Sequence, residues 1–326
     1  MNIKKTVPAL IVSVALLFSA CKGCKQRDEA LIGTDQAPVK VGFMPAPNAD
    51  SEPANVKTVV DALSKETGLK IEPILARNYM ELIDGLASKK MDVVFINSLG
   101  YLLAHDWSKA EALLQLKGED GRIVYNSAII TNVNSGIKSI NEINGKSFAY
   151  SDPFSLSGYL MPLAVFAANN VSPVRTTFAG GSSDVVEAVY NGSIDAGAIY
   201  YAEREPDGRI HDARLNLVSK HKDMLDKVEI IYISDPIPTT PIVFRAGLNP
   251  TIKDKIANAF SKFNADLVVI GALNKLYGAT GVLPADDKRY DAIRDMLKKL
   301  GKDVTEVVPG AVNFYKTHLW DVVPTY

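Results

Sequence analysis

The chain has very little cysteine and histidine for its length. Two of its 326 residues are cysteine and four are histidine, so no disulfide framework is available and the fold must rest on its hydrophobic core. The histidines are scattered, and no group of His, Cys or carboxylate residues has the spacing of metal ligands. The sequence therefore predicts neither a metal site nor a cofactor.

Motifs of common enzyme classes and an excess of positive charge are also lacking. The chain has no Gly-x-Ser-x-Gly elbow, no P-loop and no dinucleotide-binding fingerprint. Its 36 Lys and Arg residues are balanced by 37 Asp and Glu residues, and no basic run occurs. Neither catalysis nor nucleic-acid binding is therefore predicted.

The N-terminal segment has the pattern of a secretory signal. Two lysines precede an apolar run at residues 7–20, which is too short for a typical membrane span. The run ends in Ser-Ala-Cys, which resembles a bacterial lipobox in which Cys21 is lipidated and becomes the first mature residue. Phe18 departs from the usual aliphatic residue, so an ordinary secretory signal is the alternative.

Cys21 and Cys24 also spell Cys-x-x-Cys, which can mark a redox pair. No strand precedes the pair, so this is the weaker interpretation. Removal of residues 1–20 leaves 306 residues with 34 basic and 37 acidic side chains, a net charge of −3. That length is enough for two lobes. Residues 21–38 are polar and aperiodic, and they predict a flexible, lipid-anchored tether.

Short apolar runs alternate with helical patterns after the tether. This rhythm predicts an α/β fold of two lobes, each a mainly parallel sheet flanked by helices. The expected strands of the first series are 39–44, 69–75 and 92–96, with helices near 56–63 and 79–89. The second series has expected strands at 147–150, 174–178 and 196–200, with helices at 158–168 and 184–190.

The two series share a detail that favours lobes of similar build. An apolar helix residue precedes an aspartate by nine positions in both, as Ile83 with Asp92 and Val186 with Asp195. We expect both aspartates to fix the turn into the following strand. Coincidence between two common helix-to-strand turns is the alternative.

Two further strands are expected where the chain could cross between lobes, at 127–131 and 242–244. Two crossings make the first lobe discontinuous, with residues 39–134 and 243–326 in lobe 1 and 135–242 in lobe 2. Helices at 253–269 and 290–300 are then expected to return to lobe 1 or to the back of the hinge.

Polar segments follow the predicted strands, at the sheet edge where ligands of open α/β sheets bind. These segments are helix N-termini, whose free N–H groups and partial positive charge favour anions. Ser155 and Ser157 add hydroxyl donors, and Tyr79 and Tyr101 add phenol donors from the other lobe. Helix capping is the alternative role for the serines, and burial is the alternative for the tyrosines. Their convergence at one edge favours an anion site.

One segment carries a specific resemblance. Tyr150-Ser-Asp-Pro-Phe-Ser-Leu-Ser-Gly-Tyr-Leu-Met-Pro-Leu163 resembles the hallmark of the phosphate/phosphite/phosphonate ABC-transporter substrate-binding family: Asp-Pro, then Ser-x-Ser-Gly-Tyr and a nearby proline. The segments that begin at Asn97, Gly181 and Ile237 are similar to other stretches of that family. The resemblance implies a periplasmic binding protein fold, type II-like, with a two-crossing hinge.

The resemblance also implies a set of ligand-binding residues. In the family, a helix start and two lobe-one tyrosines hold the phosphoryl oxygens. These positions fall on Ser155, Leu156 through its backbone N–H, Ser157, Tyr79 and Tyr101.

Two departures from the family's sequence pattern, and two acidic residues, bear on the identity of the ligand. Threonine is frequent in the family where Leu156 stands, and histidine is frequent where Ser183 stands. Glu203 and Asp235 lie in regions where aminophosphonate binders carry acidic residues, although a solvated surface role is the alternative for each. The resemblance therefore implies a small phosphorus oxyanion without identifying it.

By the same resemblance, the chain is expected to be a monomeric lipoprotein in the bacterial cell envelope. It would deliver its ligand to an ABC permease and ATPase and would not be an enzyme. A binder of a sulfonate or a vitamin on the same fold is one alternative. A ligand receptor that feeds a sensor kinase is another.

Overall fold

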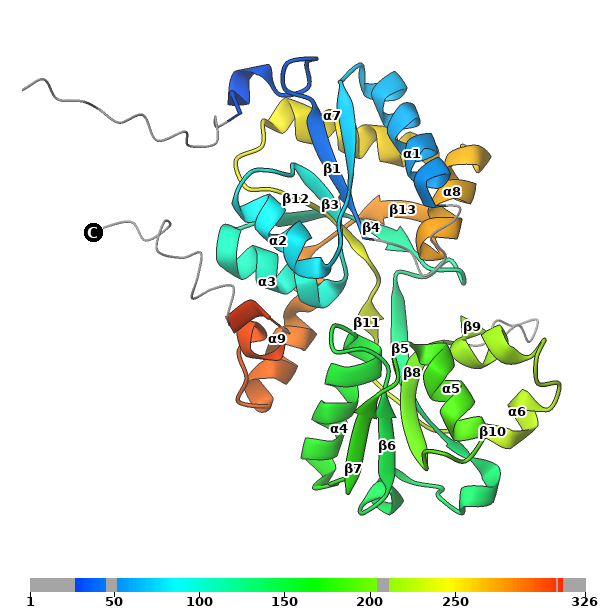
Figure 1. The fold of residues 1–326 in the computed structure, drawn as a ribbon. Helices are drawn as coiled ribbons and strands as arrows, with labels where there is room; N and C mark the ends of the chain where they lie inside the picture. Colours follow the sequence, from blue (N-terminus) through cyan, green and yellow to red (C-terminus); the bar gives the residue numbers. More distant parts are fainter. Residues whose placement is uncertain (1–26, 45–51, 204–210, 309, 313–326) are drawn as a thin grey trace, which may run out of the picture.

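The computed structural model describes residues 27–44, 52–203, 211–308 and 310–312. These residues form two lobes, each built on one mixed β-sheet with helices on both faces (Figure 1). The lobes are joined by two strand connections at a hinge.

Lobe 1 contains a six-stranded sheet in the order β13-β4-β12-β3-β1-β2. Its strands are β1 (Val39–Phe43), β2 (Ile71–Leu75), β3 (Val93–Phe95), β4 (Glu111–Lys117), β12 (Pro241–Phe244) and β13 (Gly281–Pro284). One face packs on α1 (Glu52–Thr67), α7 (Pro250–Phe263) and α8 (Leu267–Tyr277). The other packs on α2 (Tyr79–Ala87), α3 (Ser98–Ser108), α9 (Asp291–Lys299) and α10 (Val304–Val307).

Lobe 2 contains a sheet in the order β10-β5-β8-β6-β7, with β9 and β11 paired at its margins. Its strands are β5 (Val124–Asn132), β6 (Ser147–Tyr150), β7 (Arg175–Phe178), β8 (Ala196–Ala202), β9 (His211–Asp212), β10 (Val228–Ile233) and β11 (Ile237–Pro238). One face packs on α5 (Ser182–Tyr190), beside α6 (Met224–Lys227). The other packs on a continuous helix made of η5 (Leu156–Leu160) and α4 (Met161–Asn169).

The two lobes have the similar build that the sequence predicted. In each, a central strand pairs in parallel with two neighbours, β1 with β2 and β3, and β6 with β7 and β8. The two aspartates occupy equivalent positions. Asp92 accepts a hydrogen bond from the backbone N–H of Lys40, and Asp195 accepts one from that of Ser147, both at 2.8 Å. Their predicted structural role is confirmed.

The sheets are mixed, which corrects the expectation of mainly parallel sheets. Strands β12 and β5, which lead from the hinge, run antiparallel to β3 and β8. Strands β4, β13 and β10 add further antiparallel pairs. Each sheet therefore has a group of three parallel strands at one end and is extended toward the other end by antiparallel pairs.

The crossings lie at different residues from those expected. The chain leaves β4 and enters β5 through residues 118–123, and it returns from β11 to β12 through residues 239–240. Because β5 pairs with β8 and β10 of the second sheet, residues 124–132 belong to lobe 2 and not to lobe 1. Gln115 donates hydrogen bonds to Ile123 and Thr239, so it ties the two crossings together.

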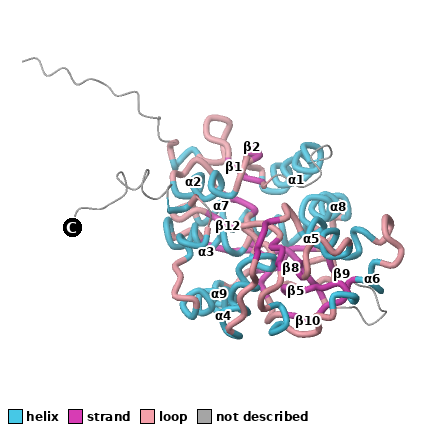
Figure 2. The backbone as a smooth tube through the Cα atoms, turned by 60° about the horizontal axis from the view of Figure 1, so that its bottom comes forward, coloured by secondary structure: helices cyan, strands magenta, loops and turns pink. Residues whose placement is uncertain are grey.

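The C-terminal helices return to lobe 1 and to the back of the hinge, as expected. The single helix predicted at 253–269 is two helices, because Asp266 caps a new helix start. Figures 1 and 2 place α9 beside α4, and a groove of about 570 Å³ lies between them. Among the described residues no single helix could span a membrane; only the pair α7 and α8, bent by 99°, has the necessary length and composition.

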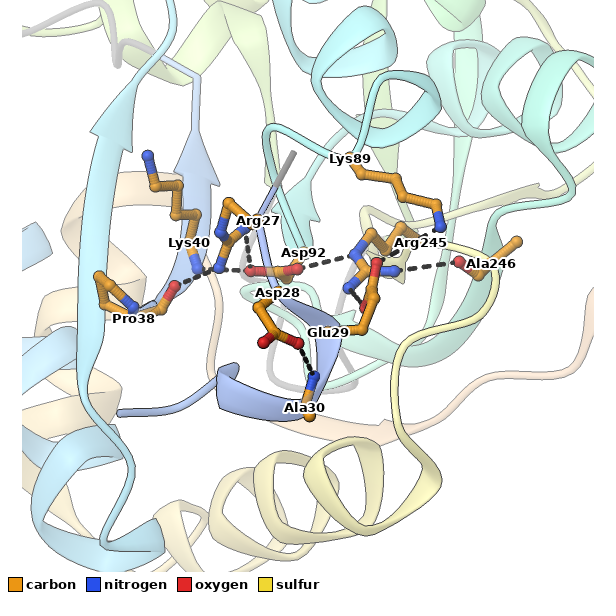
Figure 3. A network of polar contacts seen from close by, with 10 residues as sticks. All are labelled: Arg27, Asp28, Glu29, Ala30, Pro38, Lys40, Lys89, Asp92, Arg245 and Ala246. Atoms are coloured by element: carbon orange, nitrogen blue, oxygen red, sulfur yellow. Dashed lines mark hydrogen bonds and ion pairs between the residues drawn. The ribbon is translucent and has the colours of Figure 1, made fainter. Parts of the chain in front are cut away.

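The segment that precedes β1 packs on lobe 1, so the prediction of a flexible tether is wrong for residues 27–38. Figure 3 shows how Arg27 and Glu29 reach the fold. Arg27 donates to Asp92 at 2.9 Å, and Arg245 donates to Asp92 at 2.7 Å and to Glu29 at 2.5 Å. Asp92 and Arg245 are both buried. The segment thus completes a buried charge network, while residues 21–26 lie outside the described residues.

Candidate anion-binding site between the lobes

A cleft of about 360 Å³ lies between the lobes at the carboxyl ends of their parallel strands. Lobe 1 contributes Tyr79 and Asn97, and Tyr125 comes from the start of β5. Lobe 2 contributes the loop that leads into η5 and the start of α5. The complete lining is Tyr79, Asn97, Tyr125, Ser151, Asp152, Phe154, Ser155, Leu156, Gly181 and Ser182.

Four helix starts meet at this cleft. Tyr79 is the first residue of α2, and Asn97, Ser155 and Gly181 are the N-caps of α3, η5 and α5. The N–H groups of a first helical turn have no partner within the helix, and the helix dipole places partial positive charge there. Among the described residues that line the cleft, none is lysine or arginine. The cleft is therefore suited to an anion held by neutral donors.

Ser155 both caps its helix and keeps a donor for a ligand. Its Oγ accepts a hydrogen bond from the N–H of Gly158 at 2.8 Å. A hydroxyl that accepts a bond still has its own hydrogen to donate. The N–H groups of Leu156 and Ser157 belong to the same first turn. This helix start accordingly offers one hydroxyl and unpaired backbone donors.

Asn97 and Phe154 bring the two lobes into contact beside the cleft. The Asn97 side chain caps α3 by accepting from Gly100 at 2.8 Å, and its amide donates to the carbonyl oxygen of Phe154 at 3.0 Å. The rings of Tyr79 and Phe154 lie 5.1 Å apart. Leu156 and Leu160 of lobe 2 share a hydrophobic cluster with α2 and α3. These contacts join the two lobes beside the cleft.

The two cleft tyrosines are neutral donors near pH 7. Burial raises the pKa of Tyr79, and the nearby Asp152 carboxylate raises it further. Burial also raises the pKa of Tyr125 to about 12, although its hydrogen bond with the Ser157 side chain opposes this shift. Both phenols therefore keep their protons and can donate to a ligand oxygen.

Tyr101 does not face the cleft, which corrects the expectation for this residue. Its hydroxyl donates to Asp287 at 2.6 Å, and its ring packs on Tyr290 at 4.7 Å between centroids. The side chain is 1 % exposed and belongs to the core of lobe 1. The alternative of burial therefore holds for Tyr101.

Ser157 and Ser183 lie beside the cleft without lining it. Ser157 is buried, its side chain contacts Tyr125, and its carbonyl oxygen accepts from Ser127 at 2.6 Å. Ser183 accepts from the Asn216 amide at 3.1 Å. The residue before Ser183, Ser182, lines the cleft in its place.

The two acidic candidates lie elsewhere. Glu203 forms an ion pair with Arg122, and its side chain is 70 % exposed. Asp235 lines the groove between α4 and α9, behind the hinge. Neither carboxylate lines the cleft, and the surface alternative describes both, because Asp235 is also exposed.

Several lining residues were not predicted. Asn97 and Asp152 stand two residues after the ends of β3 and β6, in the segments that carried the resemblance, so their position was a usable signal. Tyr125 lies two residues before the expected crossing strand at 127–131. Its being an aromatic residue near the hinge was the only feature of the sequence that could have pointed to a role in the cleft. Among the residues that the structure describes, no three His, Cys, Asp or Glu side chains are grouped as metal ligands.

Comparison with known proteins gives a consistent result. The family model described as "ABC transporter, phosphonate, periplasmic substrate-binding protein" matches residues 41–290. The "Phosphonates-binding periplasmic protein" of Escherichia coli is 29% identical over 208 residues, which cover 62% of this chain and 59% of that protein. The "Phosphate-import protein PhnD" of Mycolicibacterium smegmatis is 24% identical over 89% of this chain and 94% of its own length.

A solved structure shares the fold. It is PhnD1 from Prochlorococcus marinus in complex with methylphosphonate, with a TM-score of 0.63 and 18% identity. The match covers 81% of this chain and 98% of that one. At this identity the likeness concerns the arrangement of the two lobes.

Proposed function

This chain belongs to the family of periplasmic substrate-binding proteins of phosphonate ABC transporters, and from that premise we propose that its cleft binds a small phosphorus oxyanion for import. The observation that carries the proposal is the meeting of four helix starts at one cleft without a lysine or arginine in its lining. Neutral donors hold an oxyanion through hydrogen bonds and release it when the lobes separate.

The Asp152 carboxylate favours binding of a phosphorus oxyanion over binding of a sulfate or sulfonate at this site. Its carboxylate lines the cleft and accepts from the N–H of Phe154 at 2.7 Å. A carboxylate repels a fully ionised anion but accepts a hydrogen bond from a protonated one. Phosphate monoesters exchange their second proton near pH 6, so a phosphorus oxyanion can supply that proton. A sulfate or sulfonate cannot, because it is fully ionised at neutral pH.

Tyr79→Phe and Ser155→Ala should each weaken methylphosphonate binding by about ten- to a hundredfold. Each removes one donor to a charged oxygen, an interaction of roughly 1.5–3 kcal/mol. Tyr101→Phe is the matched control, because its hydroxyl donates to Asp287 and not into the cleft. Isothermal titration calorimetry of the three variants with methylphosphonate and phosphate measures the effect.

If Tyr101→Phe and Tyr79→Phe lost methylphosphonate affinity equally, the assignment of Tyr79 to the cleft wall and of Tyr101 to the core would be wrong. Ser155→Ala should also lower stability by up to about 1 kcal/mol, because Ser155 caps the helix. Thermal unfolding without ligand separates this loss from the loss of binding.

The chain's partners follow from the same proposal. The family delivers ligands to a membrane permease driven by an ATPase, and a monomer with one cleft is sufficient for that task. Binding a ligand and delivering it to a permease requires no bond to be broken, so the proposed function includes no catalysis.

Lipidation of Cys21 would hold the protein at the membrane. The supporting observation is the Ser-Ala-Cys sequence at the end of the apolar N-terminal run. Cys21→Ser should move the protein from the membrane fraction to the soluble fraction of the cell envelope, while Cys24→Ser should not. Immunoblots of fractionated cells measure the distribution. Unchanged fractionation of Cys21→Ser would refute the anchor.

A further inference from the structure

We propose that the natural ligand carries an uncharged, ring-sized substituent on its phosphorus oxyanion, and that this substituent occupies a second compartment on the hinge side of the cleft. The inference rests on the proposed function, because it places the oxyanion at the helix starts described above. It adds the chemical class of the rest of the ligand.

The second compartment lies beside the first and shares part of its wall. It has a volume of about 490 Å³ and shares Asn97 and Tyr125 with the anion compartment. Its other walls are the end of β8, the hinge crossing at residues 239–240 and the end of α8. A group attached to an oxyanion near Tyr125 can therefore extend toward the hinge.

Aromatic rings and neutral polar groups form much of its wall. Tyr125, Tyr200 and Tyr277 line it together with the side chains of Thr239 and Asn274. The Tyr277 ring is held in place by stacking on Phe95, at 5.2 Å between centroids and an interplanar angle of 8°. Burial raises the pKa of Tyr200, so its phenol is neutral at physiological pH. Such walls favour a planar or hydroxylated ring.

The charged residues of the compartment cancel one another. Lys117 and Lys275 line it together with Glu119 and Asp120. Asp120 is paired with Arg122 at 3.2 Å, and Glu119 lies 3.7 Å from a ring nitrogen of His211. With two ammonium groups and two carboxylates, the wall has no excess of negative charge to attract an amine.

The compartment is too large to be filled by a ligand as small as phosphate or methylphosphonate. Phosphate or methylphosphonate held at the helix starts would fill only the anion compartment, and the compartment of about 490 Å³ beside it would then hold water. Removal of apolar ring surface from water adds affinity in proportion to the area buried. A phosphonate with a ring should therefore bind more tightly than one with a methyl group.

Calorimetric titration with phosphate, methylphosphonate, phenylphosphonate and 2-aminoethylphosphonate tests the inference. We expect phenylphosphonate to bind at least about tenfold more tightly than methylphosphonate. We expect no gain for 2-aminoethylphosphonate. Ala202→Trp places an indole in the compartment and should bring the ratio of the phenylphosphonate and methylphosphonate affinities close to one. Ala265→Trp, on the exposed turn between α7 and α8, should leave that ratio unchanged.

The outcomes separate this inference from the proposed function. If methylphosphonate binds as tightly as phenylphosphonate, or 2-aminoethylphosphonate binds most tightly, the inference fails and the proposed function stands. If none of the four ligands binds, the proposed function fails. The order of the four ligand affinities in the unmodified protein tests the inference even if Ala202→Trp does not fold.

Discussion

Asp92→Ala is expected to lower the free energy of unfolding by about 3–5 kcal/mol, the usual cost of removing one partner of a buried ion pair. Asp92 is fully buried and accepts hydrogen bonds from Arg27, Lys40 and Arg245. Arg245 is 1 % exposed, so water cannot replace the lost carboxylate. Chemical denaturation followed by circular dichroism measures the change.

Asp291→Ala is the matched control for this prediction. Asp291 pairs with Arg294 at 2.8 Å, but its side chain is 60 % exposed. Exposed pairs contribute about 0–1 kcal/mol, so the control should remain near the parent. Asp92 stands at the amino end of β3, whereas the cleft lies at the carboxyl ends of the strands. Folded Asp92→Ala should therefore bind ligand normally, and a loss of stability below about 1 kcal/mol would contradict the account of the network.

Gly158→Ala is expected to weaken ligand binding by at least about tenfold and to lower stability by about 1–3 kcal/mol. A Cβ at this position would lie 1.6 Å from the Oγ of Ser151 and 2.7 Å from its Cβ. Ser151 is buried and lines the cleft, and its N–H donates to the carbonyl oxygen of Gly158. The helix start must therefore shift away from Ser151, which displaces the donors around Ser155.

Gly271→Ala provides the comparison within a helix. Nothing lies within 4 Å of a Cβ at Gly271 in α8. Alanine has a higher helix propensity than glycine, so this variant should be as stable as the parent or more stable. Calorimetry and thermal unfolding of both variants measure the contrast. Tight binding by Gly158→Ala would show that the η5 start does not hold the ligand.

Local patterns predicted the strands of the two parallel groups well. β6 was placed at its observed residues, and the apolar runs of β1 and β8 were found within a few positions. β4 was missed because its sequence, Glu-Ala-Leu-Leu-Gln-Leu-Lys, consists of residues with high helix propensity. Pairing with β12 and β13 makes this segment a strand. Such pairing joins residues far apart in sequence and has no local signal.

The N-terminal segment shows the same limit. Residues 27–38 lack periodicity and carry charges, which is typical of a tether. Their ordered position depends on Arg245, more than 200 residues later, which donates to Glu29 inside the network. A long-range ion pair of this kind cannot be inferred from composition.

The candidate site was predicted in part. The resemblance placed Tyr79, Ser155 and Leu156 in segments that the structure brings to one cleft. It assigned the second phenol to Tyr101, whose side chain turns into the core, while Tyr125 lines the cleft. Sequence spacing located the helix starts, but the direction of each side chain depends on the packing of both lobes.

A crystal structure of the protein with methylphosphonate would show directly whether the cleft binds the anion. We expect the phosphonate oxygens to lie within hydrogen-bond distance of the Ser155 hydroxyl, the first-turn N–H groups of η5 and the phenols of Tyr79 and Tyr125. The methyl group should point toward the hinge-side compartment. Methylphosphonate bound away from the start of η5, or a cleft that stays empty at saturating ligand, would show that these helix starts do not form the anion site.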